Sequence, residues 1–97
     1  MALKKSFKKY GDQVSFVSLS GSVAIFRRDK PNPEVERPTH FEVIKPIEIG
    51  GELTYPGASM WGIYAWTCIG EKELVQQMAK LEKKEQDWPE LTEEIFS

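Results

Sequence analysis

A single cysteine and a single histidine are the scarcest reactive side chains of this 97-residue chain. Cys68 has no second cysteine with which to form an internal disulfide, which is typical of proteins in a reducing compartment. A structural zinc site takes three or four nitrogen or sulfur ligands, whereas His40 and Cys68 supply only two. We therefore expect no metal ion and no other cofactor.

Long hydrophobic runs are missing as well. The most apolar stretch, residues 60–69, is interrupted by Gly62 and Thr67, and it is far shorter than the roughly 20 residues that cross a bilayer. The lysine-rich start has no apolar run behind it, so it does not resemble a signal peptide. These absences predict a cytoplasmic protein without a membrane partner.

Arrangements of residues that could perform catalysis are equally scarce. His40 and Cys68 could act together only if the fold brought them into contact and a third group oriented the imidazole ring. The glycines do not follow the spacing of a phosphate-binding loop. Pairs of neighbouring glutamates lie in polar stretches, where we expect them to be solvated. We predict no catalytic residue and a protein that is not an enzyme.

The chain does have an uneven distribution of charge. Residues 1–45 hold nine basic and five acidic side chains, and residues 46–97 hold four basic and ten acidic ones. The formal net charge of −2 therefore combines a basic half, which attracts anions, with an acidic half, which repels them. This pattern favours a binding function.

The first third of the chain shows β-strand patterns. Residues 14–19 and 23–26 are rich in β-branched and aromatic side chains, and residues 20–22 between them favour a turn. The two segments therefore predict a hairpin. The proline-rich residues 29–38 predict an exposed loop, because proline cannot donate the hydrogen bonds of a strand ladder.

A further strand is predicted over residues 39–49. One face carries the apolar side chains Phe41, Val43, Ile47 and Ile49. Glu42 and Glu48 fall on the opposite face with Ile44 and Pro46, and the alternation predicts a half-buried strand. Pro46 indicates an edge position or a bulge, and an edge strand could pair with a partner chain or with a second copy of this one.

The remaining elements follow from glycines and from a change of period. Gly50 and Gly51 predict a hairpin turn, with residues 52–55 returning antiparallel. Residues 60–68 form either another strand or a turn that leads into one, and their β-favouring side chains favour the strand. From Glu71 onward the pattern is helical, and its apolar face consists of Leu74, Val75, Met78 and Leu81.

Together these patterns predict one α+β domain over residues 1–97, with an antiparallel sheet of four or five strands and one C-terminal helix packed on one face. Val43, Ile47, Leu74, Met78 and Leu81 are expected in its core. The basic segment 1–12 and the acidic tail 87–97 are candidates for flexible ends.

The segments Phe41-Glu42-Val43-Ile44, Tyr55-Pro56 and Trp61-Gly62-Ile63-Tyr64-Ala65-Trp66-Thr67, followed by a charged amphipathic helix, resemble a group of small phage-type accessory proteins. The resemblance covers roughly residues 41–81, and its distinctive part is the aromatic–glycine segment. It implies the cytoplasm of a host cell as the location. It implies no catalytic or binding residue, because the group has no assigned chemistry to transfer.

The leading functional expectation is binding of single-stranded nucleic acid, which combines cations that track phosphates with aromatic faces that stack bases. The candidate cations are Lys4, Lys5, Lys8, Lys9, Arg27, Arg28 and Lys45. The candidate platforms are Tyr55, Trp61, Tyr64 and Trp66, beside Phe16, Phe26 and Phe41 on predicted strands. Two observations oppose this expectation: a small domain needs most of its aromatics inside, and a sequence pI near 5.4 is low for such domains.

The acidic tail supports three further expectations. Its ending resembles the phenylalanine-tipped tails of single-strand-binding proteins, which recruit partner enzymes and compete with DNA for a basic groove; here Ser97 follows the phenylalanine. Alternatively, the protein is an interaction module such as an inhibitor, an adaptor or a small assembly subunit. Its anchor would be Trp88, Leu91, Ile95 and Phe96 within a rim of glutamates. A third possibility is that these side chains fold back and cap the core.

Overall fold

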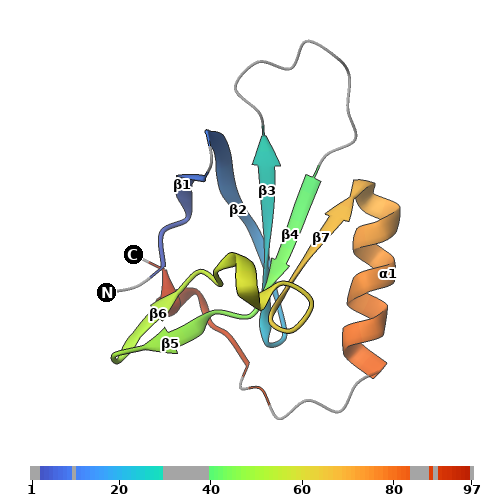
Figure 1. The fold of residues 1–97 in the computed structure, drawn as a ribbon. Helices are drawn as coiled ribbons and strands as arrows, with labels where there is room; N and C mark the ends of the chain where they lie inside the picture. The colour runs from blue at the N-terminus through green and yellow to red at the C-terminus, as the bar shows by residue number, and fades with distance from the viewer. Residues whose placement is uncertain (1–2, 10, 30–39, 84–87, 89, 97) are drawn as a thin grey trace.

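In a computed structural model of the chain, five strands form one antiparallel sheet in the order β1-β2-β3-β4-β7, and a single helix, α1, packs against β4 and β7 (Figure 1). The structure describes residues 3–9, 11–29, 40–83, 88 and 90–96. The elements of the sheet and the helix are β1 (Ser6–Lys9), β2 (Asp12–Ser20), β3 (Val23–Asp29), β4 (His40–Ile44), β7 (Ala65–Ile69) and α1 (Gly70–Lys83). A separate two-stranded sheet pairs β5 (Ile47–Ile49) with β6 (Glu52–Thr54). The α+β architecture expected from the sequence is confirmed.

Both predicted hairpins are present. Gly21 has a φ of 60° in the turn between β2 and β3, and Gly50 and Gly51 have φ values of 61° and 83° between β5 and β6, a backbone region that glycine enters without steric cost. The pairing of β2 with β3 shifts register between Phe16 and Ser18. This β-bulge leaves Val17 exposed and allows Phe16 and Leu19 to pack against the same core cluster. Of the predicted loop 29–38, Asp29 ends β3 and the rest lies outside the described residues.

The single strand predicted over residues 39–49 is wrong. The chain leaves the sheet after Ile44, and β5 begins at Ile47 in a different sheet. Pro46, at the break, has no amide hydrogen for a ladder, while the Lys45 amide donates to the carbonyl of Tyr64 at 2.7 Å. Pro46 therefore marks neither an edge strand nor a bulge: β4 is an interior strand, between β3 and β7.

Three other local predictions also differ from the structure. Residues 58–60 form a short 3-10 helix and residues 62–64 a turn, so the strand predicted over 60–68 begins only at Ala65. Val75, expected on the buried face of the helix, is 66% exposed, whereas Leu74, Met78 and Leu81 pack inward. Ile47, expected in the core, is only half-buried.

The sheet is covered on both sides, and each side has its own core. We call the side against α1 the helix face; its core contains Val23, Ile25, Val43 and Cys68, with Leu74, Met78, Leu81 and Trp88 packed on it. We call the other side the inner face; its core contains Leu3, Val14, Ala24, Phe26, Ile44, Ala65 and Phe96, with Leu53, Tyr55 and Trp61 packed on it. Among the described residues, no helix is long and apolar enough to cross a membrane.

The described tail residues join the two faces. Trp88 packs on the helix face, the Leu91 amide donates to the Gly21 carbonyl at 2.9 Å, and Phe96 is buried on the inner face. The two ends of the chain meet there, as Figure 1 shows. The segments singled out as candidates for flexible ends thus supply strand β1 and two buried side chains, Leu3 and Phe96.

Candidate binding surfaces

A buried carboxylate lies at the centre of the inner face. Glu42 is 1% exposed, so the prediction of a half-buried strand is wrong at this position. The period-two alternation of β4 is real, but both faces of this interior strand are covered. Phe41 and Val43 pack on the helix face, while Glu42 and Ile44 point to the inner face.

Three side chains contact Glu42: Arg28, Tyr55 and Lys9. Arg28 donates from Nη1 to Glu42 Oε1 at 3.1 Å and from Nε to Asp12 Oδ2 at 2.7 Å. The Tyr55 hydroxyl donates to Glu42 Oε2, and Lys9 Nζ lies 4.0 Å from the same oxygen. Two acids and two bases therefore form a network in which both carboxylate oxygens of Glu42 have partners, as a buried charge requires.

The pKa values of Lys9 and Arg28 shift in opposite directions in this network. Lys9 Nζ lies 4.1 Å from the ring centre of Trp61 and 4.9 Å from that of Tyr55, a cation–π arrangement. Partial burial lowers the pKa of Lys9 below 10.5; Glu42 opposes this shift and Arg28 adds to it. Burial also acts to lower the pKa of Arg28, but hydrogen bonds to Asp12 and Glu42 outweigh it and raise the net value.

Four of the predicted nucleic-acid contacts, Lys9, Arg28, Tyr55 and Trp61, thus come together around one acid. The arrangement stabilises the fold, because it neutralises Glu42 and closes the inner face between β1 and the segment before β7. Asp12 and Glu42 were not predicted members of any site. Period-two spacing could not identify them, because it separates the two faces of a strand without showing which face is buried.

A second group of cation and aromatic rings gathers Lys45, Tyr64, Trp66 and Trp88. Lys45 Nζ lies 5.6 Å from the ring centres of both Tyr64 and Trp88. Trp88 in turn lies 5.8 Å from Tyr64 and 6.4 Å from Trp66, centre to centre. Tyr64, Trp66 and Trp88 are half-buried, so each ring keeps part of its surface in solvent.

The remaining predicted protein-binding residues have internal contacts. Phe96 is buried, and its ring centre lies 4.4 Å from that of Phe16. Leu91 and Ile95 pack against the same core. These contacts correspond to the core-capping possibility raised for the tail, and among the described tail residues Glu90, Thr92 and Glu94 remain exposed.

The part of the helix face over β1 and β2 is not covered by α1. α1 packs against β4 and β7, while β1, β2 and the far end of β3 present polar side chains on the same side. By register and alternation, these are Ser6, Lys8, Gln13, Ser15, Ser18 and Arg27, which we call the open polar surface. Arg27 pairs with Asp29 at 3.0 Å, both about half exposed. Lys4 and Lys5 are exposed just before β1, and Lys5 Nζ lies 5.8 Å from the ring centre of Phe16.

His40 and Cys68 lie on opposite faces of the sheet. Cys68 pairs with Phe41 across β4 and β7 and packs on the helix face, whereas His40 pairs with Arg28 and Ile69 and points to the other side. Burial raises the pKa of the Cys68 thiol above 9.0; Glu73 raises it further and Lys80 opposes the shift. Within the described part of the chain, no three histidine, cysteine or acidic side chains are placed to hold a metal ion.

Comparison with protein-family models, with curated proteins and with solved structures returned no match to this chain. The function is therefore inferred from the chemistry of the surfaces.

Proposed function

We propose that this protein binds single-stranded nucleic acid through the open polar surface, without performing catalysis. The observation that carries the proposal is the side-by-side placement of hydroxyl, amide and cationic side chains on β1, β2 and β3. Serine, glutamine, lysine and arginine are the side chains that commonly donate to phosphate oxygens. Lys4, exposed just before β1, adds positive charge, whereas Lys5 lies against the rings of Phe16 and Phe96 on the inner face.

The shape of the surface supports a single strand. Three neighbouring strands span about 10 Å at ~4.8 Å per step, which suits one nucleic-acid backbone. The aromatic rings of the inner face, including Phe26 and Tyr55, pack against one another. We therefore expect phosphate contacts to dominate over base stacking, and hence a steep dependence on salt with little sequence preference.

The test is fluorescence anisotropy with a labelled oligothymidylate at low and at raised salt. The variant Lys8→Glu with Arg27→Glu should weaken binding and flatten the salt dependence by about 0.7 in log–log slope for each phosphate that the protein no longer neutralises. Lys72→Glu with Lys80→Glu, both exposed on α1, makes the same change in net charge away from the surface. Equal weakening in both double variants, or no binding by the folded protein at low salt, would overturn the proposal.

A second candidate function is protein interaction, as an inhibitor, adaptor or assembly subunit. It is supported by a pocket beside Trp88, and not by Leu91, Ile95 and Phe96, because these three side chains pack against the core of the inner face.

A further inference from the structure

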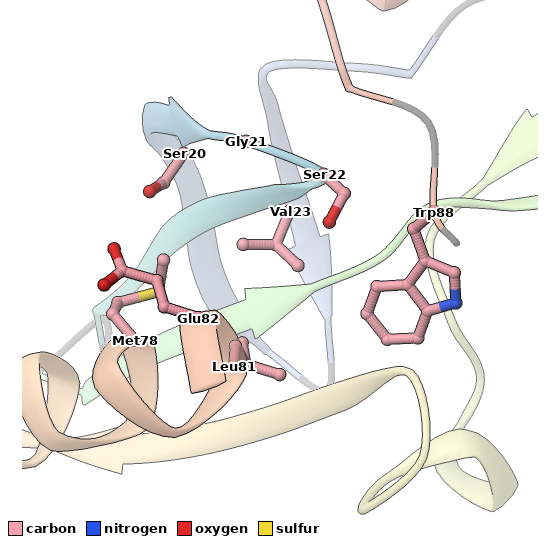
Figure 2. A pocket seen from close by; sticks show the side chains of 8 residues that line it. All are labelled: Ser20, Gly21, Ser22, Val23, Met78, Leu81, Glu82 and Trp88. Carbon is pink, nitrogen blue, oxygen red and sulfur yellow. The ribbon is translucent and has the colours of Figure 1, made fainter. Parts of the chain in front are cut away.

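A small pocket opens where the turn between β2 and β3, the last turns of α1 and the tail meet (Figure 2). Its volume is about 160 Å³. Cavities that hold small organic ligands usually measure ~300–1,000 Å³, so this one is sized for a single side chain. It is lined by Ser20, Gly21, Ser22, Val23, Met78, Leu81, Glu82 and Trp88.

The lining changes character from one end to the other. Figure 2 shows the Ser20 hydroxyl and the Glu82 carboxylate toward one end and the Trp88 indole at the other, with Val23 and Leu81 between them. Glu82 is the one charged side chain among the described lining residues, and it is exposed. The pocket thus has an apolar middle, and one end carries two hydrogen-bond acceptors, the Ser20 hydroxyl and the negatively charged Glu82 carboxylate.

A long side chain with an apolar stem and a cationic tip matches this gradient. Arginine matches it better than lysine, because the planar guanidinium presents five donors in a fork that fits a carboxylate and neighbouring hydroxyls, and it also stacks on aromatic faces. An anionic side chain would be repelled by Glu82, and a purely apolar one would make no polar contact with its carboxylate. We propose that the pocket binds an arginine side chain of a partner protein, with the stem against Trp88 and Leu81 and the guanidinium at Glu82 and Ser20.

This site shares no residue with the open polar surface and does not depend on nucleic-acid binding. Trp88 is held in place by its contacts with Tyr64 and Trp66, and the Gly21 carbonyl is fixed by the Leu91 amide. Both walls of the pocket are therefore formed before any partner arrives, which lowers the entropic cost of binding.

The experiment is an NMR titration of the 15N-labelled protein with N-acetyl-arginine N-methylamide, an arginine probe with uncharged ends. We expect saturable shifts of the Trp88 indole N–H, assigned with Trp88→Phe, and of the Gly21 amide. The citrulline analogue, which has the same shape without the charge, should shift neither signal.

Glu82→Gln should weaken binding of the arginine probe about tenfold, as expected for removal of one charged hydrogen-bond partner. Glu71→Gln, at the other end of α1, is the matched control and should bind as the parent protein does. The proposal would be overturned if the shifts fail to saturate, if the citrulline analogue causes the same shifts, or if Glu82→Gln leaves the affinity for the arginine probe unchanged. Saturation by cytidine in place of the arginine probe would overturn it in favour of a base-binding pocket.

Discussion

Leu3 and Phe96 lie side by side at the two ends of the chain, as partners in an isolated parallel β-bridge, and both are buried. The Leu3 amide donates to the Ile95 carbonyl at 2.7 Å. Each end therefore holds the other against the inner face. The acidic tail is part of the core through its apolar residues. Removing the tail would therefore destabilise the fold and would not report on binding alone.

The first prediction concerns that contact. Phe96→Ala should lower the free energy of unfolding by about 3 kcal/mol, because it removes a buried ring that contacts Phe16 and Phe26. Urea denaturation followed by circular dichroism measures the loss. Glu94→Ala, an exposed neighbour, should stay within ~0.5 kcal/mol of the parent. An unchanged midpoint for Phe96→Ala would mean that the tail does not belong to the core.

The tail's charges can be tested without disturbing its apolar contacts. If the acidic tail competes with nucleic acid for basic residues, Glu90→Gln with Glu94→Gln should raise oligonucleotide affinity at low salt, where exposed charges are least screened. The same anisotropy titration measures the change. Stability should be unaffected, since both side chains are exposed. Unchanged affinity at low salt would rule out competition by these two charges.

Glu42 should be the most sensitive charged position in the chain. Glu42→Gln leaves Arg28 and Lys9 beside a neutral amide in a largely buried site, and breaking a buried ion pair costs about 3–5 kcal/mol. Thermal unfolding at neutral pH measures this loss. Arg27→Gln, whose ion pair with Asp29 is half exposed, is the control and should cost at most ~1 kcal/mol.

The same substitution has a spectroscopic consequence. Because Glu42 opposes the burial that lowers the pKa of Lys9, Glu42→Gln should lower that pKa further, as measured from the Lys9 side-chain resonances against pH. Burial of the charged amine disfavours the folded state at neutral pH. The free energy of unfolding should therefore rise as Lys9 loses its proton, between its lowered pKa in the folded state and 10.5.

The helix offers a matched pair of positions. Met78→Asp places an unpaired charge against the core of the helix face and should cost several kcal/mol, on the order of 3. Val75→Asp makes the same chemical change at a side chain that is 66% exposed and should cost less than ~1 kcal/mol. Similar losses of stability for both variants, measured by urea denaturation, would contradict the orientation of α1.

Cys68 should be slow to react and should make stability depend on alkaline pH. Its thiol pKa is raised above 9.0 by burial, so the folded state favours the protonated form. That contribution is complete below pH 9.0 and is lost as pH rises through the raised pKa. Between pH 8 and pH 10 the parent protein should therefore lose more stability than Cys68→Ser does, as measured from their unfolding curves. Alkylation of the folded protein should stay slow.

Patterns that repeat along the chain predicted the fold class correctly. The hairpins around Gly21 and Gly50–Gly51, and the inward packing of Leu74, Met78 and Leu81, follow from local turn chemistry and helical period. Val75 was misplaced because it follows Leu74 directly and so lies about 100° around the helix from it, outside the stripe of Leu74, Met78 and Leu81 that packs on the sheet. The break at Pro46 was missed because the apolar alternation continues across it into a different sheet.

The candidate surfaces were harder to predict from the sequence than the fold. Composition identified the basic and aromatic residues but not their mutual contacts, so Lys9, Tyr55 and Trp61 were grouped as ligand contacts although they lie together beside Glu42. The open polar surface depends on which strands the helix leaves uncovered, and the pocket depends on Trp88 meeting the β2–β3 turn. Both arise from long-range packing, which local spacing does not encode.

The position of β1 at the outside of the sheet has a consequence for solubility. Among the described strands none pairs with its outer side, and such an edge is a template on which other chains can add strands and aggregate. Lys4, Lys5 and Lys8 are exposed along and just before this edge, where like charges on two approaching copies repel each other. These lysines therefore disfavour edge-to-edge pairing of two copies, and neutralising them by acetylation would weaken that repulsion.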